Sequence, residues 1–361
     1  MKTYPIPMAP GPVRVPASIR AVYETDYGSG DLEPEFLELY NQTEADLQQI
    51  FGTRSSVAIQ TGEGMLALWG ALKSCLKAGD KVLALATGVF GYGFGEMAAA
   101  IGAEVRTIGF EYDETLSRWD EIEQAIRAFR PKMITAIHCE TPSGTLNPMA
   151  ELGELKRRLG VPLLVVDVVA SLGGAPVKVD EWGIDLALGG SQKALCAPPS
   201  LSFVTVSPAA WQVIEQVNYP GYDALLPFRD AQKDFYFPYT PYWHGVAALH
   251  AGAELLLGEG LEQAYDRHAR VAAQCRDGIT MLGLELFPRP GAVNSPTVTA
   301  VKAPERIGWA ELDRRFRGLG LVVGGSYGPL TGKVFRLGHM GSQADPDLMA
   351  QALEVIGKAV R

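Results

Sequence analysis

Apolar and polar residues follow two different periods along the first half of the chain. Short, nearly continuous apolar runs, typical of strands buried on both faces, alternate with longer segments of helical apolar spacing. These runs predict strands at 56–61, 81–86, 104–108, 133–138, 163–167, 185–188 and 201–206, and helices at 33–51, 64–72, 92–101, 118–129 and 148–159. Strands that alternate with helices form a parallel sheet with helices on both faces. We therefore predict a doubly wound α/β domain in which the last strand is reversed.

The pattern changes after residue 243. Helices are expected at 243–257, 261–282, 309–317 and 345–360, and strands at 297–301, 321–324 and 334–338. Such a grouping is typical of a compact α+β unit. Five prolines before residue 17 predict an irregular N-terminal arm. We therefore expect an arm at 1–20, a large domain at 21–245 and a smaller C-terminal domain at 246–361.

One lysine lies in an apolar loop directly after a predicted strand. Gly189 and Gly190 are expected to end the strand at 185–188, and Lys193 follows on a tight loop among Gly, Ala, Leu, Cys and Pro. Lysine is usually solvated, and burial lowers its pKa so that it can act as an amine nucleophile. A Schiff-base lysine is one interpretation. A lysine that reaches the surface from its loop is the other, and this stretch alone supports both equally.

A carboxylate ends a second apolar strand. Asp167 follows the run Val161–Val166. In doubly wound sheets, ligands bind beyond the carboxyl ends of the strands, where we expect both Asp167 and Lys193. A pyridoxal ring needs this pair, because the amine forms the imine and the carboxylate keeps the ring nitrogen protonated. As an alternative, Asp167 is a helix cap or turn residue.

A glycine turn leads from the strand at 56–61 into the next helix. Gly62 and Gly64 would expose backbone N–H groups at the positive end of the helix dipole, which suits a phosphate. Glu63 argues partly against a phosphate, because a carboxylate repels it unless the carboxyl group is protonated or turned away. Its alternative role is that of a favourable acid in the first turn of the helix.

The glycine-rich turn at 88–95 has two interpretations. It resembles a dinucleotide fingerprint, but the spacing is GxGxG rather than GxGxxG and no acidic residue clearly ends the next strand. A dehydrogenase is therefore less favoured. The glycines could instead let Phe90 lie over a ring, and a core phenylalanine is the alternative.

Two further polar positions are candidates for ligand contacts. The loop at 138–148 contains Thr141, which could contact a ring hydroxyl or a substrate, although prolines and a glycine also explain this loop as a plain turn. Arg336 lies in an apolar strand and needs a partner there. A substrate carboxylate and a structural ion pair are equally supported partners.

Composition excludes several classes of protein. The chain has 361 residues, 32 basic and 41 acidic side chains and a net charge of −9, without a basic run, so nucleic acid and acidic membranes are not expected partners. No apolar run is long enough to span a bilayer. The four cysteines are far apart and predict a reducing cytoplasm rather than a disulfide framework. The five histidines lack metal-ligand spacing, so no metal is expected.

Together, these residues resemble the class V aminotransferases of fold type I, the group of alanine–glyoxylate and serine–pyruvate aminotransferases. The similarity runs over nearly the whole chain, and its most specific part is the order Thr61-Gly62, Asp167, Ser191-Gln192-Lys193 and Arg336. The resemblance implies a mostly parallel, seven-stranded doubly wound sheet and a smaller C-terminal α+β domain. It also implies pyridoxal 5′-phosphate as the cofactor and a homodimer with shared sites.

The resemblance implies a role for each matching residue. Lys193 would form the Schiff base and move the proton, Asp167 would pair with the pyridine nitrogen, and Phe90 would stack on the ring. Gln192 would bind the phosphate, and so would the partner subunit's Thr240. Further cofactor contacts are implied for Thr61, Gly62, Glu63, Gly64, Thr141 and Val169, and Arg336 would hold the substrate α-carboxylate.

One subgroup, pyridoxamine–pyruvate aminotransferase, is more similar still. The matching stretches are Gly62-Glu63 and residues 88–95, 141–148, 197–199 and 338–341. That enzyme takes unphosphorylated pyridoxamine as a substrate. Glu63 fits this chemistry, because it places an anion where the phosphate loop usually has a small hydroxyl residue. Gln192 belongs instead to the phosphate-binding pattern. An enzyme with bound pyridoxal phosphate and an enzyme that uses free pyridoxamine therefore both remain possible interpretations.

We predict an aminotransferase that moves an amino group between a small amino acid and pyruvate or glyoxylate, because a single arginine clamp suits a monocarboxylate. The alternative is transamination of free pyridoxamine or pyridoxal as a substrate. A lyase such as a cysteine desulfurase is less favoured, because it needs a reactive cysteine on a mobile loop, and Cys139 and Cys196 lie on short, proline-flanked loops. A non-enzymatic binding protein is the least favoured.

Overall fold

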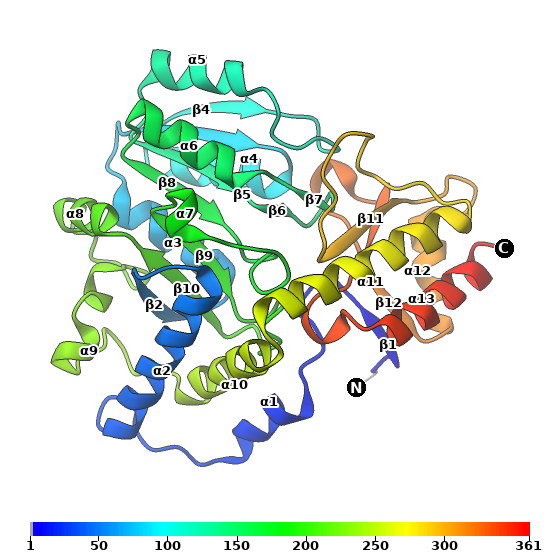
Figure 1. The fold of residues 1–361 in the computed structure, drawn as a ribbon, viewed down its shortest axis with the longest axis horizontal. Helices are drawn as coiled ribbons and strands as arrows, with labels where there is room; N and C mark the ends of the chain where they lie inside the picture. The colour runs from blue at the N-terminus through cyan, green and yellow to red at the C-terminus, as the bar shows by residue number, and fades with distance from the viewer. Residues whose placement is uncertain (1–2) are drawn as a thin grey trace.

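The protein folds around two main β-sheets (Figure 1). The computed structural model describes residues 3–361. Within that range, every helix is too short or too polar to cross a membrane.

The larger sheet has seven strands in the order β2-β10-β9-β8-β5-β3-β4. Its strands are β2 (Ser56–Thr61), β3 (Lys81–Ala86), β4 (Glu104–Gly109), β5 (Met133–Ile137), β8 (Leu163–Asp167), β9 (Leu186–Gly190) and β10 (Leu201–Val206). Strand β10 runs antiparallel to β2 and β9, whereas the other neighbouring strands are parallel. The predicted seven-stranded, mostly parallel sheet with its reversed last strand is confirmed.

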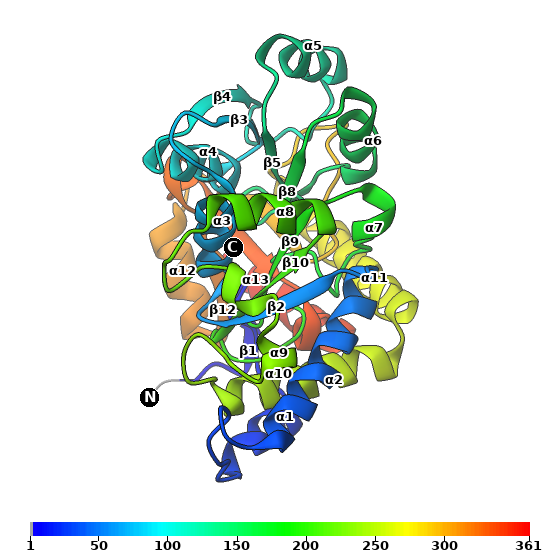
Figure 2. The ribbon, with the colours of Figure 1, turned by 90° about the vertical axis from the view of Figure 1, so that its left-hand side faces the viewer.

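Helices cover both faces of this sheet, because parallel neighbours must be joined by crossovers. Figure 2 shows α3 (Gly64–Cys75) and α4 (Val89–Ala100) on one face, and α6 (Met149–Leu159) and α7 (Val179–Trp182) on the other. Helix α5 (Trp119–Phe129) packs against α6, and α2 (Pro34–Phe51) packs against α10 (Trp243–Glu259). The shorter elements of this part of the chain are α1 (Ala17–Ala21), α8 (Pro208–Val217), α9 (Ala231–Asp234), the 3-10 helices η1 (Val22–Glu24) and η2 (Leu226–Phe228), and the hairpin β6 (Cys139–Glu140) and β7 (Thr145–Leu146).

The smaller sheet has the strand order β1-β12-β13-β11. Its strands are β1 (Ile6–Met8), β11 (Val298–Lys302), β12 (Leu321–Gly325) and β13 (Val334–Gly338). The helices around it are α11 (Leu261–Met281), α12 (Trp309–Gly318), α13 (Pro346–Ala359), η3 (Gly328–Leu330) and η4 (Gly341–Gln343). Strand β1 pairs in parallel with β12, so the N-terminal segment belongs to the sheet of the C-terminal residues.

Three local expectations are corrected by the structure. Strand β1 and helix α1 lie in the segment expected to be irregular. Strand β9 continues through Gly189 and Gly190, which were expected to end it, because both pair with β10. Helix α4 already begins at Val89 inside the glycine-rich turn, because Gly91 lets the helix approach β3: a Cβ there would lie 2.8 Å from Ala86 Cα.

Two large hydrophobic cores divide the molecule. One contains the seven-stranded sheet together with α2 and buried residues of α10, and the other contains Val271 and Cys275 of α11 with the smaller sheet and α13. The change from one core to the other falls within α11. A boundary at residue 246, inside α10, stays a prediction.

Candidate active site

Lys193 lies on the loop after β9, at the carboxyl end of the large sheet, and it lines a partly open cavity. Its Nζ donates a hydrogen bond to the backbone oxygen of Pro10 at 2.6 Å. Burial lowers the pKa of this amine to about 8, and the nearby charge of Arg336 acts in the same direction. The side chain is thus held against Pro10 beside the cavity, which favours the Schiff-base interpretation, and that interpretation stays a prediction.

Asp167 ends β8, the strand next to β9, so the topology brings it to the same edge as Lys193. Its side chain is 8% exposed and lines the same cavity. Burial raises the pKa of Asp167 to about 6, while the Val169 N–H, which donates to Oδ1 at 2.7 Å, and the charge of Lys193 oppose this rise. The turn contact with Val169 fits the capping alternative, but Asp167 also lines the cavity.

The cavity has a volume of about 150 Å³. Its lining includes most of the residues selected from the sequence: Glu63, Gly64, Phe90, Thr141, Asp167, Val169, Gln192 and Lys193. Met65, Leu68, Cys139 and Ala170 complete it. The polar loop, the glycine turn before α3 and the lysine loop thus converge at one point of the sheet edge.

Four selected residues do not line this cavity: Thr61, Gly62, Thr240 and Arg336. Thr61 is the last residue of β2, and its N–H donates to the Tyr239 hydroxyl at 3.1 Å. The N–H of Gly62 donates to the Ser200 oxygen at 2.8 Å and is therefore already used. Thr240 is exposed. Its role toward a second subunit stays a prediction.

Both carboxyl oxygens of Glu63, in the turn before α3, accept hydrogen bonds. One carboxylate oxygen accepts a hydrogen bond from Met65 N at 3.1 Å and caps the helix. The other accepts from Gln192 Nε2 at 3.2 Å. Glu63 therefore has both expected properties. It is an acid at the start of α3, and it places a carboxyl group beside the cavity. Within residues 3–361, Gln192 Oε1 is among the buried polar atoms that have no hydrogen-bond partner.

Glu140 is a site residue that the sequence analysis did not select. It is fully buried, and its carboxyl oxygens accept hydrogen bonds from Gly91 N at 2.6 Å and Phe90 N at 3.3 Å. Burial raises its pKa to about 8, although these two N–H groups lower it. Glu140 thus holds the start of α4, from which Phe90 borders the cavity. Its sequence signal was weak, because prolines and glycine already explained the loop.

Arg336 lies in β13 and is 3% exposed. Its Nε donates to the Gly325 oxygen at 2.7 Å, and its guanidinium lies 4.7 Å from the centre of the Tyr327 ring. Among residues 3–361 no carboxylate lies within ion-pair distance of Arg336, so the expected alternative of a structural ion pair is wrong. Burial lowers the pKa of Arg336, which an approaching anion would reverse.

Cys139 also lines the cavity and was not selected as a site residue. It lies in the short hairpin strand β6, and its Sγ is 3.2 Å from Ser295 Oγ. Burial raises the pKa of this thiol to about 11. A neutral, hydrogen-bonded thiol on a strand is the opposite of the mobile thiolate that desulfurase chemistry requires.

Lys193, Asp167 on the neighbouring strand and the aromatic side chain of Phe90 thus line one cavity. Residues 9–313 match the family model "Aminotransferase class-V". An uncharacterized aminotransferase of Methanocaldococcus jannaschii is 35% identical, over 95% of this chain and 89% of that protein. Pyridoxamine–pyruvate transaminase of Mesorhizobium japonicum is 31% identical, over 91% of this chain and 85% of that protein.

A solved structure extends the match from sequence to fold. Alanine–glyoxylate aminotransferase of Nostoc superposes with a TM-score of 0.95 at 28% identity, covering 100% of this chain and 96% of that one. Its arrangement of elements is thus that of the protein described here. From the family model and from relatives that span nearly the whole chain, the protein belongs to the class V aminotransferases.

Proposed function

We propose that the protein transfers an amino group between a small amino acid and pyruvate or glyoxylate, with pyridoxal phosphate as the cofactor and Lys193 as the catalytic residue. One observation carries the proposal: Lys193 and Asp167 line the same cavity. The lowered pKa of Lys193 makes the uncharged, nucleophilic amine more abundant near neutral pH than in an ordinary lysine.

The residues of the cavity fit this cofactor. Asp167 would hold the ring nitrogen, Phe90 would lie against the ring, and the partnerless Gln192 Oε1 marks a place where a polar ligand group is expected. When bound, the cofactor supplies a ring that draws electrons away from the substrate Cα. Lys193 would then carry the proton to and from that carbon.

Arg336 supports a monocarboxylate substrate. It is buried, and its Nε and Nη2 both donate to the Gly325 oxygen, so its cationic charge is left for an external anion. A bidentate bond from the guanidinium to the α-carboxylate would orient the substrate toward Lys193. Pyruvate and glyoxylate have no second carboxylate and need only this one clamp.

A second candidate, transamination of free pyridoxamine with pyruvate, is favoured by Glu63. Its carboxylate caps α3 and contacts Gln192, so a negative charge already lies where a cofactor phosphate would bind. Pyridoxamine lacks the phosphate and would avoid this repulsion. The similarity to pyridoxamine–pyruvate transaminase of Mesorhizobium japonicum also supports free pyridoxamine as the substrate.

Spectra and turnover separate the two candidates. Purified protein is mixed with pyridoxal phosphate or with pyridoxal, and binding is followed by visible absorbance. A panel of amino donors is then assayed with pyruvate and glyoxylate. Tight, phosphate-dependent binding with turnover of an amino acid supports the first candidate, and turnover of free pyridoxamine supports the second. Unchanged activity and absorbance of Lys193→Ala would refute both.

We also propose a cytoplasmic homodimer. The cytoplasmic location is supported by the four cysteines, which are all free and buried. A second subunit would bring the partner subunit's Thr240 to the phosphate end of the site. Analytical ultracentrifugation tests the dimer, and complementation between Lys193→Ala and Thr240→Val subunits tests whether the two sites are shared.

A further inference from the structure

The N-terminal segment Ala9–Arg14 crosses directly over the catalytic lysine. The backbone oxygen of Pro10 accepts the hydrogen bond from Lys193 Nζ at 2.6 Å. Val13 N donates to the backbone oxygen of Gln192 at 3.1 Å. Gly11 lies so close that a Cβ there would be 2.5 Å from Lys193 Nζ. This segment therefore forms one wall around the lysine side chain.

The other side of the same segment rests on the smaller sheet. A Cβ on Gly338, at the end of β13, would lie 2.4 Å from Pro10 Cα, so only glycine permits this approach. A Cβ on Gly324 of β12 would lie 2.8 Å from Pro10 Cδ and 3.3 Å from Arg336 Nη2. Segment 9–14 thus contacts both Lys193 and the strands around Arg336.

Gln343 fastens this segment at both ends. Its Nε2 donates to the oxygens of Ala9 and Gly338, each at 2.8 Å, and its Oε1 accepts from Arg14 N at 3.0 Å. The side chain is 1% exposed, so these bonds are made away from water. Replacing the side chain would leave buried backbone groups without partners, which is costly.

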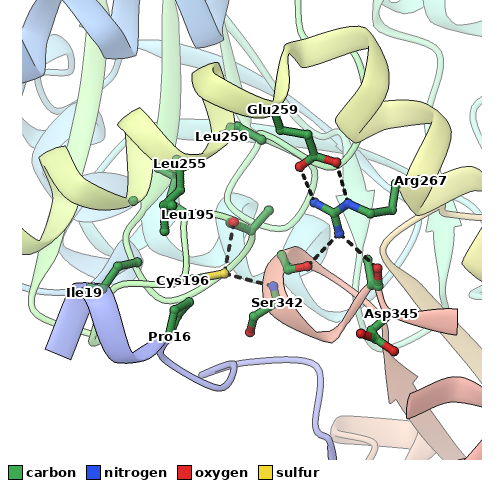
Figure 3. A pocket seen from close by; sticks show the side chains of 14 residues that line it. Pro16, Ile19, Leu195, Cys196, Leu255, Leu256, Glu259, Arg267, Ser342 and Asp345 are labelled. Carbon is green, nitrogen blue, oxygen red and sulfur yellow. Dashed lines mark hydrogen bonds and ion pairs between the residues drawn. The ribbon is translucent and has the colours of Figure 1, made fainter. Parts of the chain in front are cut away.

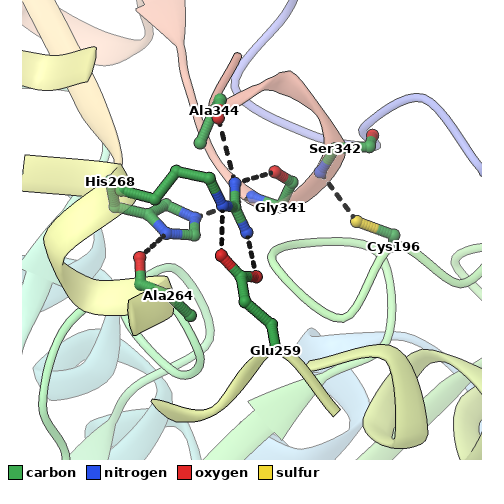
Figure 4. A network of polar contacts seen from close by, with 8 residues as sticks. Cys196, Glu259, Ala264, His268, Gly341, Ser342 and Ala344 are labelled. Atoms are coloured by element: carbon green, nitrogen blue, oxygen red, sulfur yellow. Dashed lines mark hydrogen bonds and ion pairs between the residues drawn. The ribbon is translucent and has the colours of Figure 1, made fainter. Parts of the chain in front are cut away.

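The backbone around Gln343 is itself held in place from α11 (Figure 4). Arg267 Nη1 donates to the oxygens of Gly341 at 2.9 Å and Ala344 at 3.0 Å, and Glu259 neutralises its charge. His268 Nε2 accepts from Gly341 N at 2.9 Å, which leaves Nδ1 to donate to Ala264. Gln343 therefore projects from a loop whose backbone is held by hydrogen bonds from α11.

The same loop also contacts the lysine loop. Ser342 N donates to the Cys196 sulfur at 3.0 Å, and both residues line a hollow of about 360 Å³ (Figure 3). Cys196 is three residues after Lys193. The loop held by α11 is thus linked to the lysine in two ways. It contacts Cys196 on the lysine loop, and through Gln343 it binds segment 9–14, which contacts Lys193.

We propose that Gln343 is a positioning residue, whose side-chain amide holds segment 9–14 against Lys193 and so fixes the amine in the cavity. This inference rests on the proposed function insofar as Lys193 is the catalytic amine. Gln343 itself does not line the cavity. Its effect would pass through the backbone of Ala9 and Arg14 to Pro10.

The test compares Gln343→Ala and Gln343→Glu with the wild-type full chain. The first variant removes all three hydrogen bonds, and the second keeps an acceptor for Arg14 N but loses both donors. Gln274→Ala is the matched control, because Gln274 Nε2 donates to the Pro346 oxygen at 3.0 Å in the same part of the molecule without touching segment 9–14. Should Gln343→Ala fail to fold, Gln343→Glu serves the same test.

Three quantities are measured: hydrogen exchange of the peptide that contains Val13 and Arg14, the pH midpoint of the visible absorbance of the cofactor-loaded protein, and kcat and KM. In Gln343→Ala we expect exchange to be at least about ten-fold faster and kcat to fall about ten-fold with a smaller change in KM. The pH midpoint should shift, because the surroundings of the Lys193 nitrogen change. The control should match the wild type.

Two results would overturn the proposal. One is wild-type exchange of this peptide in a folded Gln343 variant. The other is faster exchange with unchanged pH midpoint and kcat, which would make segment 9–14 a structural strap only. A wild type without transaminase activity would refute the proposed function instead, and the exchange measurement would still report on Gln343.

Discussion

The Glu63 carboxylate accepts a hydrogen bond from the Gln192 side-chain amide, with 3.2 Å between Oε2 and Nε2. Glu63 carries an acidic group, and Gln192 is the residue to which the family resemblance assigns phosphate binding. We therefore propose that this pair decides whether the cavity accepts a phosphorylated or an unphosphorylated pyridoxal compound.

Replacing Glu63 should shift this preference toward the phosphorylated compound. Glu63→Ser removes the negative charge and leaves a hydroxyl that can still cap α3. We expect the affinity ratio of pyridoxal phosphate to pyridoxal to rise roughly five- to thirty-fold, because charge near a helix N-terminus is worth about 1–2 kcal/mol when partly buried. Titrations followed by absorbance give both dissociation constants. Glu63→Gln is the control for shape, and an unchanged ratio in both variants would show that Glu63 does not select the substrate.

Replacing Arg336 should weaken binding of the 2-oxo acid. Arg336→Lys keeps the charge but loses the bidentate geometry and the contact with the Tyr327 ring. We expect KM for pyruvate or glyoxylate to rise about ten- to hundred-fold, as the loss of about 1.5–3 kcal/mol from a charge-assisted hydrogen bond implies. Binding of the cofactor alone should not change. An equal loss of cofactor binding would show that Arg336 supports the fold rather than the substrate.

The buried Glu140 makes stability depend on pH. Its pKa is raised from about 4.5 to about 8, so the folded protein binds a proton that the unfolded chain releases over that range. Its contribution to stability is therefore fully present below pH 4.5 and is lost as the pH rises through 8. Asp167 acts in the same direction between its ordinary value of 3.8 and about 6.

Glu140→Gln should flatten this dependence. Glutamine keeps an oxygen that can accept from Gly91 N and does not titrate. Urea denaturation at pH 5, 6, 7 and 8 gives the free energy of unfolding for both proteins. The wild type should lose stability relative to Glu140→Gln as the pH rises, and a constant difference would show that Glu140 titrates normally.

The sequence predicts strands better than it predicts contacts between distant segments. The apolar run ending at Asp167 and the loop around Lys193 were recognisable, because a continuous apolar strand followed by polar residues is a local signal. Gln343 gave no local signal, since its role depends on backbone more than 300 residues away. Strand β1 was missed because a short strand among prolines has no periodicity of its own, and it forms only by pairing with β12.

The glycines of α4 offer a matched pair that tests how closely this helix must approach the sheet. A Cβ on Gly91 would meet Ala86 Cα at 2.8 Å, whereas a Cβ on Gly93 would have nothing within 4 Å. Gly91→Ala should therefore push the start of α4 away from β3 and destabilise the fold by about 1–3 kcal/mol. Gly93→Ala should stabilise it by about 0.5–1 kcal/mol, because alanine favours the helix and restricts the unfolded chain.

Because Phe90 and Gly91 both donate to Glu140, a shift of α4 should also disturb the cavity. We expect Gly91→Ala to weaken cofactor binding as well as stability, while Gly93→Ala leaves cofactor binding unchanged. Thermal unfolding and absorbance titrations of the two variants check both effects. If Gly91→Ala lost stability yet bound the cofactor normally, the position of Phe90 would not depend on close packing of α4 against β3.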